Sequence, residues 1–140
     1  MKKYIILFSI LLASCNAPVN EPQGAGYWIG DDGNEKYVIA SDELTEIYSN
    51  WVEAHNNKDI DAVLSLQTDS IRIALSNGNV IEGKDAHAEA LSNYFTTDPS
   101  WNMYWALPYK AVNKGEEWII AGQYVTNTSA DGEEIAVQRM

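Results

Sequence analysis

The chain has 140 residues, a hydrophobic fraction of 46% and a formal net charge of −11, values that suit one folded domain. The strong negative charge excludes nucleic acid and anionic membrane surfaces as partners held through charge. Cys15 is the only cysteine, so a disulfide framework is excluded and the fold must depend on a hydrophobic core.

Residues 1–15 have the organisation of an export signal. Lys2 and Lys3 precede an apolar run over 4–12, which is well short of the roughly 20 residues of a membrane-spanning helix. The stretch 12–15, Leu-Ala-Ser-Cys, resembles the bacterial lipobox, whose cysteine is lipidated. We therefore expect a lipoprotein signal, with Cys15 as the membrane anchor in the cell envelope, on either its periplasmic or its outer-surface face. The alternative is an ordinary secretory signal.

Residues 16–40 are predicted to form a flexible tether, because proline and glycine interrupt them and no apolar periodicity survives. Within this segment, Tyr27-Trp28-Ile29 is unusual for a linker, and we expect it to dock on the domain. The acidic stretch 31–35 lacks the ligand spacing of a calcium loop and is interpreted as a solvated turn. Removal of residues 1–15 would take away two lysines and no acid, which changes the charge from −11 to −13.

Helical periodicity begins after Ser41, an expected N-cap. Apolar residues recur at helical spacing from Leu44 to Val52, and Asn56-Asn57 ends this helix. Asp59 is predicted to cap a second, shorter helix that ends near Leu66. A third helix is expected over 85–96.

Alternating patterns predict strands in the rest of the chain. A strand over 71–75 returns through Asn77-Gly78, the strongest short hairpin signal. Longer alternating strands are predicted over 101–109 and 118–126, and a last one begins at Ile135. Pro108 requires a bulge or an edge position. The element order is that of an α+β domain.

This order resembles the nuclear transport factor 2-like superfamily, which includes SnoaL-like polyketide cyclases, ketosteroid isomerase and scytalone dehydratase. The resemblance rests on the run 51–63 (WVEAHNNKDIDAV), on 69–71 (DSI) and on 81–86 (IEGKDA). It implies a SnoaL-like domain over 41–140, in which three N-terminal helices pack on a curved antiparallel sheet to make a cone with a pocket. Family members usually add a further strand, so the C-terminal strand is apparently missing and we expect the chain to be a fragment.

The candidate pocket residues are aromatic or polar side chains on faces expected to turn into the cone. They are Tyr48, Trp51, His87, Tyr94, Trp105, Trp118, Tyr124 and Gln138. Glu117 and Gln123 are further polar residues that alternate with apolar neighbours. A few polar groups among aromatic walls are typical of a small-molecule site, and we expect no cofactor and no metal.

Catalytic groups are harder to find in the sequence. The resemblance places Trp51 where ketosteroid isomerase-like members have a catalytic tyrosine, and no base lies near Leu75-Ser76. His55 is predicted to be a helix-terminal surface residue, and His87 to be structural. Three hypotheses follow: binding of a small apolar or aromatic ligand, acid–base catalysis of the SnoaL type on a carbonyl compound, or a module that forms a homodimer through an open sheet face.

Overall fold

The structure is a computed structural model that describes residues 24–30, 33–128, 132 and 134–139, and for 134–139 only the backbone. The predicted signal segment over 1–15, with Cys15, lies outside these residues. The helices are α1 (Glu43–Asn56), α2 (Ile60–Ser65) and α3 (Lys84–Tyr94), followed by the 3₁₀ turn η1 (Phe95–Thr97). The strands are β1 (Gly24–Gly30), β2 (Gly33–Ile39), β3 (Arg72–Ala74), β4 (Val80–Glu82), β5 (Ser100–Ala111), β6 (Glu117–Thr128) and β7 (Glu134–Arg139).

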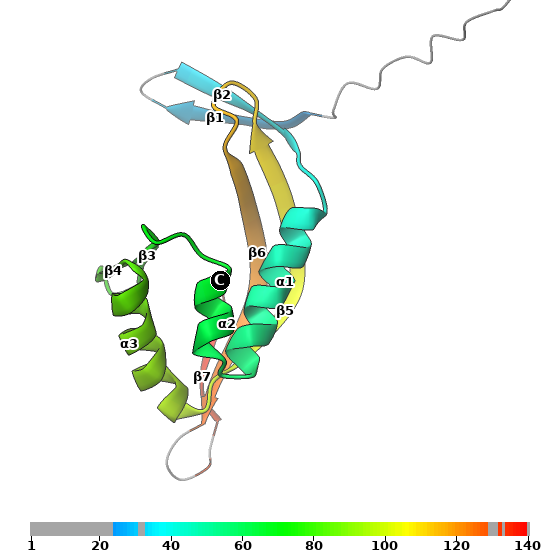
Figure 1. Cartoon of the computed structure of the whole chain (residues 1–140). Coiled ribbons are helices and arrows are strands. Elements are labelled where there is room, and N and C mark those ends of the chain that lie inside the picture. Colours follow the sequence, from blue (N-terminus) through cyan, green and yellow to red (C-terminus); the bar gives the residue numbers. More distant parts are fainter. Residues whose placement is uncertain (1–23, 31–32, 129–131, 133, 140) are drawn as a thin grey trace, which may run out of the picture.

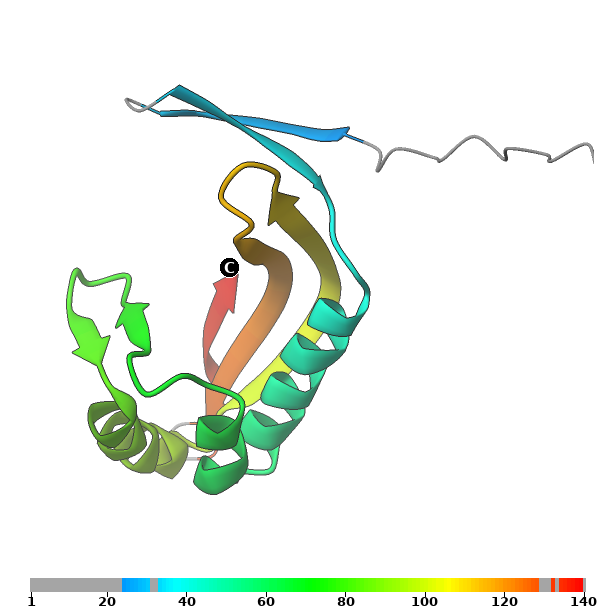
Figure 2. The same cartoon turned by 45° about the horizontal axis from the view of Figure 1, so that its top comes forward.

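Five strands form one antiparallel sheet in the order β1-β2-β5-β6-β7, and β3 pairs with β4 as a separate hairpin. The long strands β5 and β6 curve, and α1 lies along them (Figures 1 and 2). Helix α2 contacts both α1 and α3, the end of α3 packs on β5 through Tyr94, and the β3–β4 hairpin contacts α3. The predicted α+β architecture, with three helices on a curved antiparallel sheet, is confirmed.

Local sequence signals account for the helix ends. The Ser41 hydroxyl oxygen accepts a hydrogen bond from the Glu43 amide at 3.2 Å, and the Asp59 carboxylate accepts one from the Ala62 amide at 2.9 Å. Each bond satisfies an amide that has no partner within its helix. The predicted Asp59 cap is therefore confirmed, as is the hairpin turn at Asn77-Gly78. The N-cap of α1 is Asp42, which makes no side-chain cap hydrogen bond, and Ser41 lies one residue before it.

Asn56 joins the end of α1 to the start of β5. Its side-chain amide donates to the Trp101 carbonyl at 2.9 Å, and its side-chain oxygen accepts from the Trp101 amide at 2.7 Å. These two bonds fix the indole of Trp101 in the core, where it packs with Val52 of α1 and Val125 of β6. A second cluster of Ala54, Val63 and Leu91 joins the three helices.

The sequence prediction of a tether over 16–40 is wrong for its second half. Residues 24–39 form the β1–β2 hairpin, and β2 pairs with the end of β5 from Tyr37↔Ala111 to Ile39↔Tyr109. The glycines that suggested a linker serve as turn and bulge positions in this hairpin, and Gly33 has a φ of +110°. The sheet thus starts before the predicted domain boundary at residue 41.

The sequence predicts a bulge or an edge position at Pro108, and the structure has the edge, because the pairing of β2 with β5 ends at Ile39↔Tyr109. The Pro108 carbonyl accepts a hydrogen bond at 3.1 Å from the amide of Ala40, the residue just past the end of β2. The nitrogen of a strand residue points to the same side as its carbonyl, so the missing N–H of Pro108 faces β2. The pairing of β5 with β6 therefore loses no hydrogen bond. The irregularity in β5 lies instead between Met103 and Trp105, where the register with β6 shifts. An extra residue at this point, Tyr104, changes which side chains share a face.

Candidate functional site

Five side chains from α1, α3 and β6 form what we call the interior cluster: Tyr48, Trp51, His55, His87 and Gln123. His55 is 2% exposed, His87 4% and Gln123 1%, although all three are polar. The imidazole centroids of His55 and His87 are 6.4 Å apart. Buried polar groups normally have hydrogen-bond partners, so the partners of these side chains indicate what the cluster can do.

Each imidazole donates a hydrogen bond from Nδ1 to an oxygen of the protein. His55 Nδ1 lies 2.8 Å from the Trp51 carbonyl oxygen, and His87 Nδ1 lies 2.9 Å from Oε1 of Gln67. An oxygen of either kind accepts, so Nδ1 carries the proton in both neutral rings and Nε2 carries the lone pair. No hydrogen bond to either Nε2 atom comes from the part of the chain that the structure describes. Within the described residues, both Nε2 atoms thus lack a protein donor.

Burial makes both imidazoles weak bases. Desolvation, with a further contribution from the nearby His87, lowers the pKa of His55 to about 4, even though the bond to the Trp51 carbonyl acts in the opposite direction. Desolvation also lowers the pKa of His87. Both rings are therefore neutral hydrogen-bond acceptors at neutral pH.

A hydrogen bond between Tyr48 and Gln123 joins α1 to β6 within the interior cluster. The Tyr48 hydroxyl donates to Oε1 of Gln123 at 3.0 Å, and burial raises the pKa of this tyrosine. Trp51 stacks on Tyr48 at a centroid distance of 5.6 Å, and its other neighbour is His55 at 3.7 Å. Tyr48 and Trp51 are only half-buried, so another molecule can reach them.

Around the interior cluster the walls are apolar. Trp101 meets the His55 ring edge-on at 4.8 Å, and Phe95 lies 6.1 Å from it. Tyr94 and Met103 are half-buried and pack against the same core. The arrangement places a few hydrogen-bonding groups within aromatic walls, which is the usual composition of a small-molecule site.

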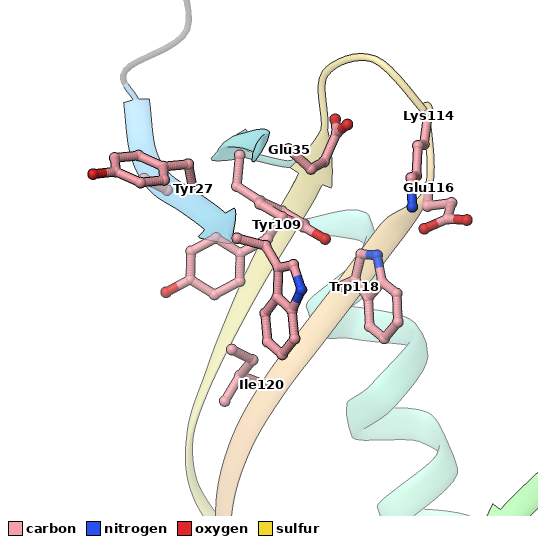
Figure 3. A pocket seen from close by; sticks show the side chains of 10 residues that line it. Tyr27, Glu35, Tyr109, Lys114, Glu116, Trp118 and Ile120 are labelled. Carbon is pink, nitrogen blue, oxygen red and sulfur yellow. The ribbon is translucent and has the colours of Figure 1, made fainter. Parts of the chain in front are cut away.

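A second site, a pocket of about 510 Å³, lies between the β1–β2 hairpin and the neighbouring ends of β5 and β6 (Figure 3). Its aromatic lining comes from four strands, namely Tyr27, Trp28, Tyr37, Tyr109 and Trp118. Trp118 pairs directly with Tyr109 across β5 and β6, so the two share one face of the sheet. That face is turned away from α1, because Gln123 and Val125, which alternate with it, contact Tyr48 and Val52 of α1.

Neither a sequence-family profile nor a curated protein matches the chain at a significant level. Solved structures do match. Aln2 from a Streptomyces species superposes with a TM-score of 0.57 at 20% identity, and the alignment covers 71% of this chain and 76% of Aln2. The chain has a nuclear transport factor 2-like, SnoaL-like fold.

Other solved structures are less similar to this chain. The epoxide hydrolase/cyclase-like enzyme SalBIII of salinomycin pyran ring formation gives a TM-score of 0.45 at 16% identity, covering 70% of this chain and 89% of that one. A ketosteroid isomerase-like protein from Erwinia carotovora atroseptica gives 0.40 at 20% identity, covering 65% and 85%. Likeness at these identities shows no activity.

The SnoaL-like fold brings together four of the eight predicted pocket residues. Tyr48, Trp51 and His87 belong to the interior cluster, and Tyr94 packs edge-on against Trp101 beside it. Gln138 lies opposite Val125 in the backbone register, and its side chain is outside what the structure describes. Gln123, which the sequence analysis named only as one of several polar alternatives, faces the helices.

Three predicted pocket residues lie on the sheet face away from the helices, and one of them, Trp118, lines the pocket of about 510 Å³. Trp105, Trp118 and Tyr124 point away from the helices of the SnoaL-like domain and are exposed. Alternation separates the two faces of a strand but does not say which one meets a helix. For Trp105 the register shift is a second reason, because the extra residue Tyr104 moves the Trp105 side chain to the face away from the helices. Tyr104 and Trp105 both lie over Gly122, where an added Cβ would come within 2.2 Å of the indole nitrogen.

His55 also differs from its prediction. Its place in the last turn of α1 suggested a surface residue, yet it is buried, because α1 ends between Trp101, α2 and α3. The signal for burial was its spacing of four residues after Trp51, on the apolar stripe. Within the described residues, no cluster of three or more metal-ligating side chains exists, and no helix is long and apolar enough to cross a bilayer.

Proposed function

We propose that the SnoaL-like domain binds a small apolar or aromatic molecule at the interior cluster and accepts a hydrogen bond from it. One observation carries the proposal: the Nδ1 atoms of His55 and His87 each bond to a protein oxygen, and no described residue donates to either Nε2. A ligand with a hydroxyl or N–H group on an apolar body satisfies such an atom and fills the aromatic surroundings at the same time.

Charge and burial favour binding over acid–base catalysis. A catalytic base works best when its pKa is near the operating pH, and the His55 pKa of about 4 is far below neutrality. A neutral imidazole with such a pKa still accepts a hydrogen bond, because this requires only the lone pair. Acid–base catalysis of the SnoaL type remains the rival function, and it would need a stronger base than His55.

The binding proposal is tested with two probes of one shape, 2-naphthol and 2-methylnaphthalene. Equilibrium dialysis against the purified chain gives the ratio of their affinities. His87→Leu removes the acceptor and keeps an apolar side chain, and we expect the preference for 2-naphthol to fall about tenfold, since one hydrogen bond in such a site contributes roughly 1–1.5 kcal/mol. Trp105→Leu, on the opposite face of the sheet, is the matched control and should leave the ratio unchanged.

An unchanged ratio in His87→Leu, or no binding of either naphthalene to the wild-type chain, would contradict the proposal. Turnover of a carbonyl substrate that is lost in His87→Ala with folding intact would instead favour the enzyme.

We also propose that Cys15 tethers this domain to a membrane in the cell envelope. The support is the sequence alone: the charged start, the short apolar run and the lipobox-like residues before Cys15. Only eight residues separate Cys15 from Gly24, where β1 begins, so a lipid on Cys15 would hold the domain within roughly 30 Å of the bilayer. The ligand would then be captured next to the membrane.

A further inference from the structure

The pocket beside the β1–β2 hairpin is separate from the interior cluster and lies on the other face of the sheet. Its volume of about 510 Å³ is within the roughly 300–1,000 Å³ that small-molecule sites have. Tyr27 and Trp28 on the hairpin are 65% and 69% exposed, and Trp118 on β6 is 52% exposed. Aromatic surface that is exposed on several strands around one hollow indicates a binding site.

Charged side chains gather at one end of this pocket. Glu35 of β2 and Glu116, just before β6, line it together with Lys114 of the connecting turn, while Tyr109, Trp118 and Ile120 line the other end (Figure 3). Two carboxylates against one ammonium give this end a net negative charge, and the whole chain, at −11, adds to the negative potential. An anion is therefore disfavoured in the pocket.

Glu35 also fixes the shape of the pocket. Its carboxylate oxygens accept from the backbone amide and the side-chain amide of Asn113, at 2.7 and 3.3 Å. The bond from the Asn113 backbone amide is the main cause that lowers the pKa of Glu35, so this carboxylate stays ionised. The hairpin is thereby tied to the turn that carries Lys114 and Glu116, which holds the charged end and the aromatic walls together.

We propose that this pocket binds an organic cation, an ammonium group carried on an aromatic or alkyl body. Aromatic faces attract such a cation through their quadrupoles, most strongly those of tryptophan, and here Trp28 and Trp118 supply them. Glu116 supplies a carboxylate for the charge, and Ile120 supplies an apolar contact for the body. The ammonium group of Lys114 repels a cation, so removing it should strengthen cation binding.

Benzyltrimethylammonium is the probe, and benzenesulfonate is its counterpart of opposite charge. Titration calorimetry on the full chain should show the cation binding at least tenfold tighter than the sulfonate. Trp118→Leu should weaken cation binding about fivefold or more. Glu116→Gln should weaken it about threefold, and Lys114→Gln should strengthen it. Trp105→Leu, on the same sheet face but outside the pocket, is the matched control, and circular dichroism confirms folding.

Sulfonate binding as tight as that of the cation would overturn the proposal, and so would cation binding that neither Trp118→Leu nor Lys114→Gln changes. Lys114 lies in an exposed turn, so its variant keeps the test valid even if Trp118→Leu perturbs the sheet. His87→Leu should not affect the cation, which separates this site from the interior cluster.

Discussion

Burial keeps the imidazole of His55 neutral, so the free energy of unfolding depends on pH through this residue. Its folded-state pKa is about 4, whereas the ring in an unfolded chain titrates near 6.5. As the pH falls, the unfolded chain therefore binds the proton first. The stabilisation is complete above pH 6.5 and is lost as the pH falls toward 4, by about 3 kcal/mol in total.

Urea unfolding at pH 7, 5.5 and 4.5 measures this dependence in the wild-type chain and in His55→Gln. We expect the variant to lose less of its unfolding free energy between pH 7 and 4.5 than the wild type does, because glutamine does not titrate. His87, whose pKa is also lowered, contributes in the same direction in both proteins. Equal losses in the two proteins would show that His55 is not buried as described.

At the scale of elements, the link between α1 and β5 depends on one side chain. Asn56→Ala removes both bonds to the backbone of Trp101 and leaves its amide and carbonyl without these partners. We expect the unfolding free energy to fall by about 2–3 kcal/mol. Asn50→Ala, an exposed position in the same helix, is the matched control and should change it by less than about 0.5 kcal/mol. Similar losses in both variants would contradict the proposed role of Asn56.

The elements themselves could be predicted from sequence, since the cap at Asp59 and the Asn77-Gly78 turn are local signals. Which face of β6 contacts the helices could not be predicted, because both faces carry apolar side chains. Val125 packs on α1, whereas Trp118 and Ile120 are exposed on the other face. The β1–β2 hairpin was missed because its stability depends on pairing with β5, about seventy residues away along the chain. Three members of the interior cluster, Tyr48, Trp51 and His87, were predictable from helical spacing alone.

For the whole molecule, the sheet face away from α1 predicts self-association. Tyr104 and Leu107 are exposed there, and apolar surface of this kind favours contact with a second copy. We expect sedimentation to show a homodimer, and Leu107→Glu to produce a monomer because it places like charges opposite each other in a two-fold interface. A wild-type monomer at every concentration would contradict this expectation.

Membrane tethering is a separate prediction for the whole molecule. Cells grown with a fatty-acid analogue should label the wild-type chain and leave Cys15→Ser unlabelled, since the thiol is the expected attachment atom. The amount of protein in each sample is compared by immunoblot. Equal labelling of both chains would exclude Cys15 as the lipid site.

The hydrogen bond from the ligand to an imidazole Nε2 is the central claim, and nitrogen NMR of ¹⁵N-histidine-labelled chain observes that atom directly. His87→Leu assigns the resonances of the two rings. In the free protein, the Nε2 atoms of His55 and His87 should both resonate as unprotonated nitrogens. Saturation with 2-naphthol should move at least the His87 Nε2 resonance to lower frequency, with Nδ1 still protonated. Bound 2-naphthol that leaves both Nε2 resonances unchanged would contradict the account.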